Sequence, residues 1–335
     1  MLTTQEECTS ENVLIHLGYH KTASTWFQKS LFAESKFGFQ MSQQNRSHVH
    51  TAFCTPLISN HSENKHVNSI VNEANEVTSS GKIFVLSHER LSGYPASGGF
   101  DSINIAYTLK NTFPNAKIMF FIREQRAMIL SAWRQQIVDG GGLTLKNFLQ
   151  SPEPHIVRMP FFNLDMYCYS SIYKKYTELF GQERVMCTPY EIFCKDPKQT
   201  LSAIATFMNN EPMKNQLEGL SQTRRIQNPS IVIPLLYFQR LLNILFTRNQ
   251  LSQNCICNLG AKNVRALIRV MNRFGGRVLL GWLDSVFRKA ALKRINTCIQ
   301  DYYLRDNAIM AKLLSVDLTG LGYKCLEEKA SENER

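Results

Sequence analysis

The sequence predicts an α/β fold with a doubly wound, mostly parallel sheet, a P-loop-like phosphate-binding turn and a helical segment at the C-terminal end. Short apolar segments of strand length alternate with longer segments of helical periodicity as far as Met208. This alternation favours parallel pairing, because a parallel strand needs a crossover connection before it. From residue 231 onward the apolar spacing is helical throughout, which predicts a layer of helices without strands.

Four apolar segments are the predicted strands. Each is short and is bounded by polar or turn-forming residues, as is typical of strands buried in a sheet. The segments are 12–18, 82–87, 116–122 and 184–188.

Helices are predicted between and after these strands. Residues 26–32 carry aromatic and aliphatic side chains at helical spacing, and Thr25 before them is the expected N-cap. A run of three glycines from Gly140 ends the helix that follows the third strand. The other predicted helices are 67–77, 102–112, 124–138, 197–208, 231–246 and 264–295.

Length and composition exclude several classes of protein. The chain has 335 residues, of which 44% are hydrophobic, so it can bury a sizeable core and is not disordered as a whole. No segment reaches the ~18 consecutive apolar residues of a membrane-spanning helix, and residues 1–11 lack the basic and apolar regions of a signal peptide. We therefore expect a cytoplasmic location, where the nine cysteines stay reduced.

The chain is basic, with 38 Lys and Arg against 27 Asp and Glu and a formal net charge of +11. This excess predicts an anionic partner: a nucleotide, a nucleic acid, an acidic glycan or an anionic lipid surface. Nucleic acid is not expected, because no known nucleic-acid-binding motif is present. No metal site is expected either, because no zinc-ligand spacing fits the histidines of the polar stretch, which are His48, His50, His61 and His66.

Polar residues follow three of the predicted strands. Lys21 lies in the turn after the first strand, Glu89 follows the second, and Arg123 follows the third. Because the carboxyl ends of parallel strands meet at one edge of a sheet, we expect these side chains to lie close together. The first turn also leads into a helix, whose N-terminal amides and positive dipole end suit phosphate or sulfate. Its hydroxyl donors are Thr22, Ser24 and Thr25.

A nucleoside triphosphatase loop fits this turn poorly. The Walker pattern places a second glycine directly before the lysine, whereas Lys21 follows Gly18 by three residues and His20 precedes it. No Asp ends another predicted strand as a magnesium ligand. An ATP-dependent small-molecule or carbohydrate kinase with a variant phosphate loop is therefore kept only as an alternative.

The segment Gly18–Trp26, which reads GYHKTASTW, resembles the 5′-phosphosulfate loop of sulfotransferases that use 3′-phosphoadenosine 5′-phosphosulfate (PAPS). The family usually has a glycine where this chain has Ala23, so we expect a negative φ at Ala23. Arg123 and Ser131 resemble the family's pair for the nucleotide 3′-phosphate. Their context, IREQRAMILSAWRQQIVDGG, is similar to bacterial members with carbohydrate-type acceptors.

Three further segments extend the resemblance over most of the chain. They are the Tyr-Glu turn at 188–191, the segment 225–230, and the stretch from Asn307 to Tyr323. The resemblance implies that Tyr190 lies near the adenine, and that Trp26 packs in the core on one side and supports the adenine on the other. It also implies a sulfotransferase that converts PAPS to adenosine 3′,5′-bisphosphate without requiring a metal ion.

Transfer of a sulfuryl group has two chemical requirements. The leaving phosphate oxygen gains negative charge, so the cation of Lys21 is expected to lower the barrier. The acceptor hydroxyl needs a base, and Glu89, which ends a predicted strand beside the turn, is the first candidate. The resemblance also implies a carboxylate at this position, and it implies His88 as the second candidate. The alternative for Glu89 is a structural ion pair with Arg90 or Arg123. The predicted donor site consists of His20, Lys21, Thr22, Ala23, Ser24, Thr25, Trp26, Arg123, Ser131 and Tyr190.

One domain, residues 12–325, is expected, because the chain has no repeat and no obvious linker. A flexible N-terminus (1–11) precedes it, and a disordered tail (326–335) follows it. Within the domain we interpret residues 40–80 as an insertion on the acceptor side and residues 231–315 as a helical cap.

The acceptor is expected to be a glycan, a lipid-linked sugar or another hydroxyl compound. The basic helix 264–295 has two interpretations, namely a cap with a solvated basic face, or peripheral contact with the anionic inner face of a membrane. A hypothesis from another class is a non-catalytic basic module that binds membrane or nucleic acid through this helix.

Overall fold

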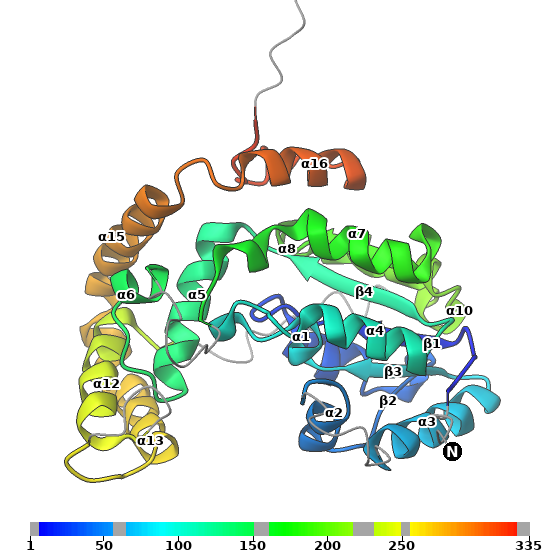
Figure 1. Ribbon diagram of the computed structural model, residues 1–335, viewed down its shortest axis with the longest axis horizontal. Coiled ribbons are helices and arrows are strands. Elements are labelled where there is room, and N and C mark those ends of the chain that lie inside the picture. The colour runs from blue at the N-terminus through cyan, green and yellow to red at the C-terminus, as the bar shows by residue number, and fades with distance from the viewer. Residues whose placement is uncertain (1–6, 56–64, 151–160, 217–230, 249–254, 327–335) are drawn as a thin grey trace, which may run out of the picture.

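The computed structural model describes residues 7–55, 65–150, 161–216, 231–248 and 255–326. Its centre is a five-stranded parallel sheet in the order β2-β3-β1-β4-β5 (Figure 1). The strands are β1 (Val13–His16), β2 (Phe39–Met41), β3 (Ile83–Ser87), β4 (Lys117–Ile122) and β5 (Val185–Pro189). The predicted doubly wound α/β fold is confirmed, and β1 lies in the middle of the sheet.

Strand β2 is the one strand of the described residues that the sequence did not predict. It is three residues long and pairs with β3 at the edge of the sheet. Only Phe39 of the strand is buried, so no apolar run marks it in the sequence. Strand β2 is held in place by backbone hydrogen bonds to β3, and such bonds leave no pattern in the side chains.

Helices cover both faces of the sheet. In β1, Val13 and Ile15 belong to one buried core and Leu14 belongs to a second core on the opposite face. Burial on both faces explains why these strands are continuous apolar runs in the sequence. The first core includes residues of α2 (Arg46–Phe53), α3 (Lys65–Ser79), α4 (Ser102–Thr112), α5 (Gln125–Val138), α6 (Leu145–Leu149) and α7 (Tyr169–Phe180). The second includes residues of α1 (Ser24–Trp26), α8 (Tyr190–Lys195), α9 (Pro197–Phe207) and α10 (Glu211–Lys214).

Short helices of other types connect these elements. A π-helix, Phe27–Leu31, continues α1. The 3-10 helices are Ser35–Phe37, Glu89–Ser92, Pro95–Ser97, Leu164–Tyr167 and Gln182–Arg184.

The C-terminal helices form a layer beside the sheet, and α12 and α15 pack against α5 (Figure 1). They are α12 (Ile233–Phe246), α13 (Ala261–Met271), the π-helix Asn272–Gly276, α14 (Arg277–Leu279), α15 (Gly281–Ile299) and α16 (Leu304–Leu314). The described part of the predicted cap is thus mostly helical, but the single predicted helix 264–295 is wrong. It is interrupted around Gly275, Gly276 and Gly281, since each glycine in a helix interior costs about 1 kcal/mol relative to alanine.

Two predicted boundaries can be compared with the structure. Cys8, within the predicted N-terminus 1–11, is fully buried, and its N–H donates to the Thr112 carbonyl at 2.9 Å. The stretch 40–80 is not simply an insertion, because it contributes Gln40 and Met41 to β2, and α3 then connects β2 to the neighbouring strand β3. Residues 1–6 and 327–335, which include most of the predicted tail, lie outside the described part.

Among the described residues, no helix is long and apolar enough to span a bilayer.

Candidate functional site

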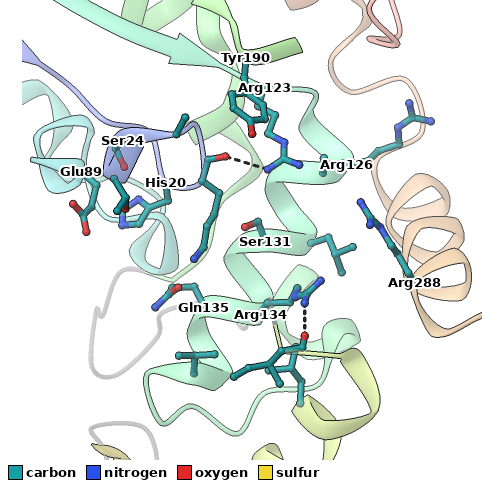
Figure 2. A pocket seen from close by; sticks show the side chains of 18 of the residues that line it. His20, Ser24, Glu89, Arg123, Arg126, Ser131, Arg134, Gln135, Tyr190 and Arg288 are labelled. Atoms are coloured by element: carbon teal, nitrogen blue, oxygen red, sulfur yellow. Dashed lines mark hydrogen bonds between the residues drawn. The ribbon is translucent and has the colours of Figure 1, made fainter. Parts of the chain in front are cut away.

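A cleft of about 2060 Å³ lies between the ends of β1, β3 and β4, helix α5 and the cap. Figure 2 shows Glu89, His20 and Ser24 on one side, Arg288 on the other, and Ser131 and Arg134 between them. Eleven Lys and Arg but only three Asp and Glu line the cleft, so it suits an anionic ligand. The predicted residues that line it are His20, Lys21, Ala23, Ser24, Thr25, Trp26, Glu89, Arg123, Ser131 and Tyr190.

The turn after β1 has an unusual backbone. Lys21 and Ala23 both have positive φ, 67° and 65°, so the expected negative φ at Ala23 is wrong. Left-handed residues that alternate with ordinary ones turn successive N–H groups toward one concave side, which is a common arrangement for binding anions. Ala23 is also the N-cap of α1, and its carbonyl accepts from the N–H of Trp26 at 2.8 Å. Thr25 therefore lies inside the helix and is not its cap.

Thr22 does not contribute its hydroxyl to the cleft. The side chain is fully buried, and its Oγ1 donates to the Tyr19 carbonyl at 2.5 Å. This bond holds the turn from inside. Thr22 is thus a structural residue of the turn, contrary to the predicted role of its side chain as a phosphate donor.

The turns after β1 and β3 are in close contact. A Cβ atom at Gly18 would lie 3.1 Å from the Cβ of Ser24 and 3.3 Å from the Cα of Glu89. The absence of a side chain at Gly18 therefore allows the backbone of the β3 turn to lie against the β1 turn. As a result Glu89 lines the same cleft as Lys21.

Arg123 at the end of β4 reaches the turn after β1. Its Nη1 donates to the backbone carbonyl of Lys21 at 3.1 Å, and its guanidinium carbon lies 5.1 Å from the ring centre of Tyr190 (Figure 2). The Tyr169 hydroxyl donates to the Arg123 carbonyl at 2.6 Å, which fixes the end of the strand. Two segments about a hundred residues apart in the sequence thus meet at one point.

Helix α5 presents one face to the cleft. Ser131 lies on this face two turns after Arg123, together with two arginines, Arg126 and Arg134, that the sequence analysis did not predict for the site. The signal was present, because residues 127, 131, 134 and 138 follow helical spacing. Arg134 donates to the Ile231 carbonyl and so ties α5 to the start of α12.

Lys21 is an exposed residue in the wall of the cleft, where other charged side chains surround its ammonium group. Burial lowers the pKa of Lys21, and the nearby charge of Arg134 lowers it further, while Asp139 and Glu89 oppose the shift. The ammonium group therefore lies close to other cations. An anion that enters the cleft would offset this repulsion, because it supplies an opposite charge.

Glu89 forms an ion pair with Arg46 of α2. Burial raises the pKa of the Glu89 carboxyl, but the charge and hydrogen bond of Arg46 and the nearby charge of His88 outweigh burial, so the pKa lies below its usual value. The carboxylate is ionised at neutral pH and can accept a proton. The partner is Arg46 rather than Arg90 or Arg123, the partners considered from the sequence.

The imidazole that faces the cleft is His20, whereas His88 is packed behind Glu89. His88 is 5% exposed, its Nδ1 accepts from the N–H of Arg90 at 3.1 Å, and it is not among the residues that line the cleft. Burial lowers the pKa of His20 to about 4, with the charge of Glu89 opposing this shift. The His20 ring is thus neutral at pH 7. The structure does not favour His88 as the second candidate base.

A hydrogen-bond network lies behind the start of α5. It includes residues outside the cleft from the segments that resemble the sulfotransferase family. Glu191 accepts from the N–H of Glu124 at 3.0 Å and from the Tyr323 hydroxyl at 2.9 Å. Gln125 donates to the side chain of Asn307 at 2.6 Å. This network holds the first turn of α5, which follows Arg123. The similar segment 225–230 lies outside the described residues.

The cap forms the wall of the cleft opposite the turn after β1. Its cleft-lining cations are Arg265, Arg269, Arg273, Arg288 and Lys293. The sequence predicts these cations as a basic helix surface but does not place them at the site. Their side chains reach the cleft because the predicted helix is interrupted in the structure. No group of His, Cys, Asp and Glu among the described residues could hold a metal ion. Independence from a metal stays a prediction.

Fold and cleft together define an α/β protein with a cationic ligand site at the carboxyl edge of a parallel sheet. Two solved structures are similar to the chain. One is a sulfotransferase from Alicyclobacillus acidocaldarius, with a TM-score of 0.44 and 16% identity over 64% of this chain and 92% of that one. The other is a sulfotransferase domain from the curacin biosynthetic pathway, with a TM-score of 0.39 and 15% identity over 67% and 82%. No protein-family model and no curated protein matches this sequence.

Proposed function

We propose that the protein is a sulfotransferase that moves a sulfuryl group from PAPS to a hydroxyl of a glycan or glycolipid. The observation that carries the proposal is the contact between Arg123 and the backbone of Lys21, at 3.1 Å. It brings together the two segments that resemble the family's sites for the 5′-phosphosulfate and the 3′-phosphate. One adenosine bisphosphate could then contact both segments.

The turn after β1 supports binding of the 5′-phosphosulfate. Its backbone N–H groups, the hydroxyls of Ser24 and Thr25 and the Lys21 ammonium are all donors suited to sulfate and phosphate oxygens. Arg123 and Ser131 would hold the 3′-phosphate, since a guanidinium can bind a phosphate with two parallel hydrogen bonds. Tyr190 and Trp26, which line the cleft between these groups, would contact the adenine.

In the proposed reaction the acceptor oxygen forms a bond to sulfur as the bond from sulfur to the bridging phosphate oxygen breaks. The leaving group is adenosine 3′,5′-bisphosphate, and Lys21 would stabilise the charge that develops on its oxygen. Glu89 would take the proton of the acceptor hydroxyl. Arg46 keeps Glu89 ionised before the acceptor binds.

The acceptor side of the proposal rests on charge. The cap presents Arg269, Arg273 and Arg288 to the cleft, opposite the turn after β1. A glycan with carboxylate, phosphate or sulfate groups would complement this wall better than a neutral one. We therefore infer that the acceptor is anionic as well as hydroxyl-bearing.

Transfer of labelled sulfur tests the proposed function. Purified protein is supplied with sulfur-labelled PAPS and a cell extract, and labelled products are separated and identified. We expect label in a saccharide-containing fraction without added magnesium. Transfer of phosphate from labelled ATP instead, with no transfer of sulfur, would contradict the proposal and favour the kinase alternative.

Three matched substitutions test the base. Glu89→Gln should lower kcat by about two orders of magnitude or more with near-normal nucleotide binding, because the proton acceptor is lost. His20→Gln tests the imidazole in the cleft, and His88→Gln is the control for a packed imidazole. A full loss of kcat in folded His88→Gln with normal turnover in Glu89→Gln would show that the assignment of Glu89 is wrong.

A further inference from the structure

The cap exposes an unusual number of large apolar side chains. Of the twenty exposed large hydrophobic residues in the described part of the chain, fifteen lie between Phe238 and Phe287. The most exposed are Val278 at 85%, Phe274 at 80%, Ile256 at 76%, Leu279 at 72% and Trp282 at 69%. Scattered apolar residues are normal on a protein surface, whereas a concentration such as this marks an interaction site.

These side chains are not needed to hold the cap on the protein. Helix α13 packs through Val264 and Ile268, and Ile268 lies in a small buried core with Val232 and Leu235 of α12. Helix α15 joins the main core through buried residues of its second half. The exposed residues belong to other positions of the same helices. We call the exposed large apolar residues between Ile256 and Phe287 the cap face.

The charge of this segment decides what kind of partner it fits. Residues 255–299 contain nine Lys and Arg and one acidic residue, Asp284. Five of these cations line the cleft, whereas Lys262, Lys289 and Arg294 are exposed and do not line it. Asp284 is occupied within the fold, since its carboxylate accepts from the N–H of Ile233 at 2.6 Å. A second copy of this chain would bring a like charge against the cap face. An anionic lipid surface instead offers phosphates for the cations and an apolar layer for the exposed side chains.

We propose that the cap face docks on the surface of an anionic bilayer. Phe274, Val278 and Trp282 enter the headgroup region, and the exposed cations that do not line the cleft, Lys262, Lys289 and Arg294, contact lipid phosphates. Val278 and Arg273 also line the cleft, so docking places the cleft next to the bilayer. Docking does not depend on the proposed sulfotransferase activity, although it favours an acceptor that is anchored in lipid.

Tryptophan fluorescence offers a direct readout of this docking. The chain has three tryptophans, and Trp26 and Trp133 are buried at 6% and 0% exposure. Trp282 is therefore the one tryptophan that can change its surroundings at the surface. The full chain is titrated with vesicles of phosphatidylcholine, with or without about a quarter of phosphatidylglycerol, at about 0.1 M salt. Sedimentation with the same vesicles measures the bound fraction.

We expect a blue shift of the emission and co-sedimentation with the phosphatidylglycerol vesicles, and neither with phosphatidylcholine alone. Phe274→Ser should weaken binding by about tenfold. Phe100→Ser is the matched control, because Phe100 is 59% exposed outside the cap face, and it should bind as the unsubstituted chain does. Lys21→Ala should also bind normally, which separates docking from catalysis.

Two results would overturn the proposal. The first is the absence of vesicle binding, or binding that Phe274→Ser leaves unchanged. The second is a dimer in solution that Phe274→Ser dissociates, since this would assign the cap face to a second copy of the chain.

Discussion

Ala23 carries backbone strain at the centre of the candidate site. A left-handed conformation costs a non-glycine residue about 1–2 kcal/mol, and the φ of Ala23 is 65°. The rest of the turn imposes this cost, and the buried hydroxyl of Thr22 is one of its supports. Strained residues of this kind persist only where the surrounding structure determines their conformation, and they often occur at functional sites.

Ala23→Gly should therefore raise the free energy of unfolding by about 0.5–1 kcal/mol, after the greater entropy of glycine in the unfolded chain is subtracted. Denaturant titration measures this change. Ala266→Gly, in the exposed interior of α13, is the control and should lower the free energy of unfolding by about 1 kcal/mol. Destabilisation by Ala23→Gly would show that the turn is not strained at this residue.

The titratable groups of the cleft also predict how activity depends on pH. The pKa of His20 is about 4, that of Glu89 lies below its usual value, and that of Lys21 is lowered mainly by burial. We expect kcat/KM to be flat between about pH 5.5 and 7.5, and to fall on the alkaline side before the usual range of lysine. Steady-state kinetics with PAPS as the varied substrate measure the profile. An acidic limb with a midpoint of about 6.5, the value of an ordinary histidine, would contradict these assignments.

At the scale of elements, α5 connects the parts of the site. It begins directly after Arg123, carries Ser131, and contacts the cap through Arg134. Its start is held from behind by Glu191, to which Tyr323 near the C-terminal end donates a hydrogen bond. Two of the segments that resemble the family, which lie far apart in the sequence, thus support the start of α5.

Tyr323→Phe should lower the free energy of unfolding by about 1.5–3 kcal/mol, because it leaves a carboxylate oxygen of Glu191 without its partner. Thermal and denaturant unfolding measure this loss. Tyr302→Phe is the control, since Tyr302 also donates to a carboxylate but is 48% exposed, and its loss should be smaller. Equal losses in the two variants would argue against a special role for the network.

The sequence was sufficient for elements with a strong apolar pattern and insufficient for others. Strands β1, β3 and β4 are apolar because they are buried on both faces of the sheet. The sequence predicted these three strands and also β5, an edge strand that is only partly buried. Strand β2 depends on backbone pairing at a sheet edge, which leaves little trace in side chains. The interruption of helix 264–295 depends on glycines whose effect varies with tertiary packing.

The same distinction applies to the candidate site. Lys21, Glu89 and Arg123 could be predicted to lie together, because the ends of parallel strands converge. The directions of individual side chains could not be predicted. Thr22 and His88 turn into the protein, while His20 and the arginines of the cap turn toward the cleft. Packing of the finished fold decides these directions.

At the scale of the whole molecule, a buried histidine links stability to pH. His16 lies fully inside the core, and burial lowers its pKa to about 4, with the charge of Glu89 opposing this shift. In the unfolded chain the pKa of His16 is about 6.5. Between pH 4 and pH 6.5 the unfolded state therefore binds more protons at His16 than the folded state does. Stability due to His16 is therefore present above about pH 6.5 and is lost as the pH falls toward 4.

The free energy of unfolding should fall by about 2 kcal/mol for His16 alone between pH 7 and about pH 5. Urea titrations at a series of pH values measure the slope. His16→Gln should remove this part of the slope, provided that the variant folds. A free energy of unfolding independent of pH over this range would mean that His16 is not buried in its neutral form.

The central claim is that one adenosine bisphosphate contacts both the turn after β1 and the end of β4. Calorimetric titration with adenosine 3′,5′-bisphosphate, without magnesium, tests it most directly. We expect one equivalent to bind, ATP not to displace it, and Lys21→Ala and Arg123→Ala each to weaken binding by about tenfold or more. Lys175→Ala on α7, outside the lining of the cleft, controls for the change of net charge and should have no effect. Absence of binding, or binding that neither substitution at the cleft weakens, would contradict the claim.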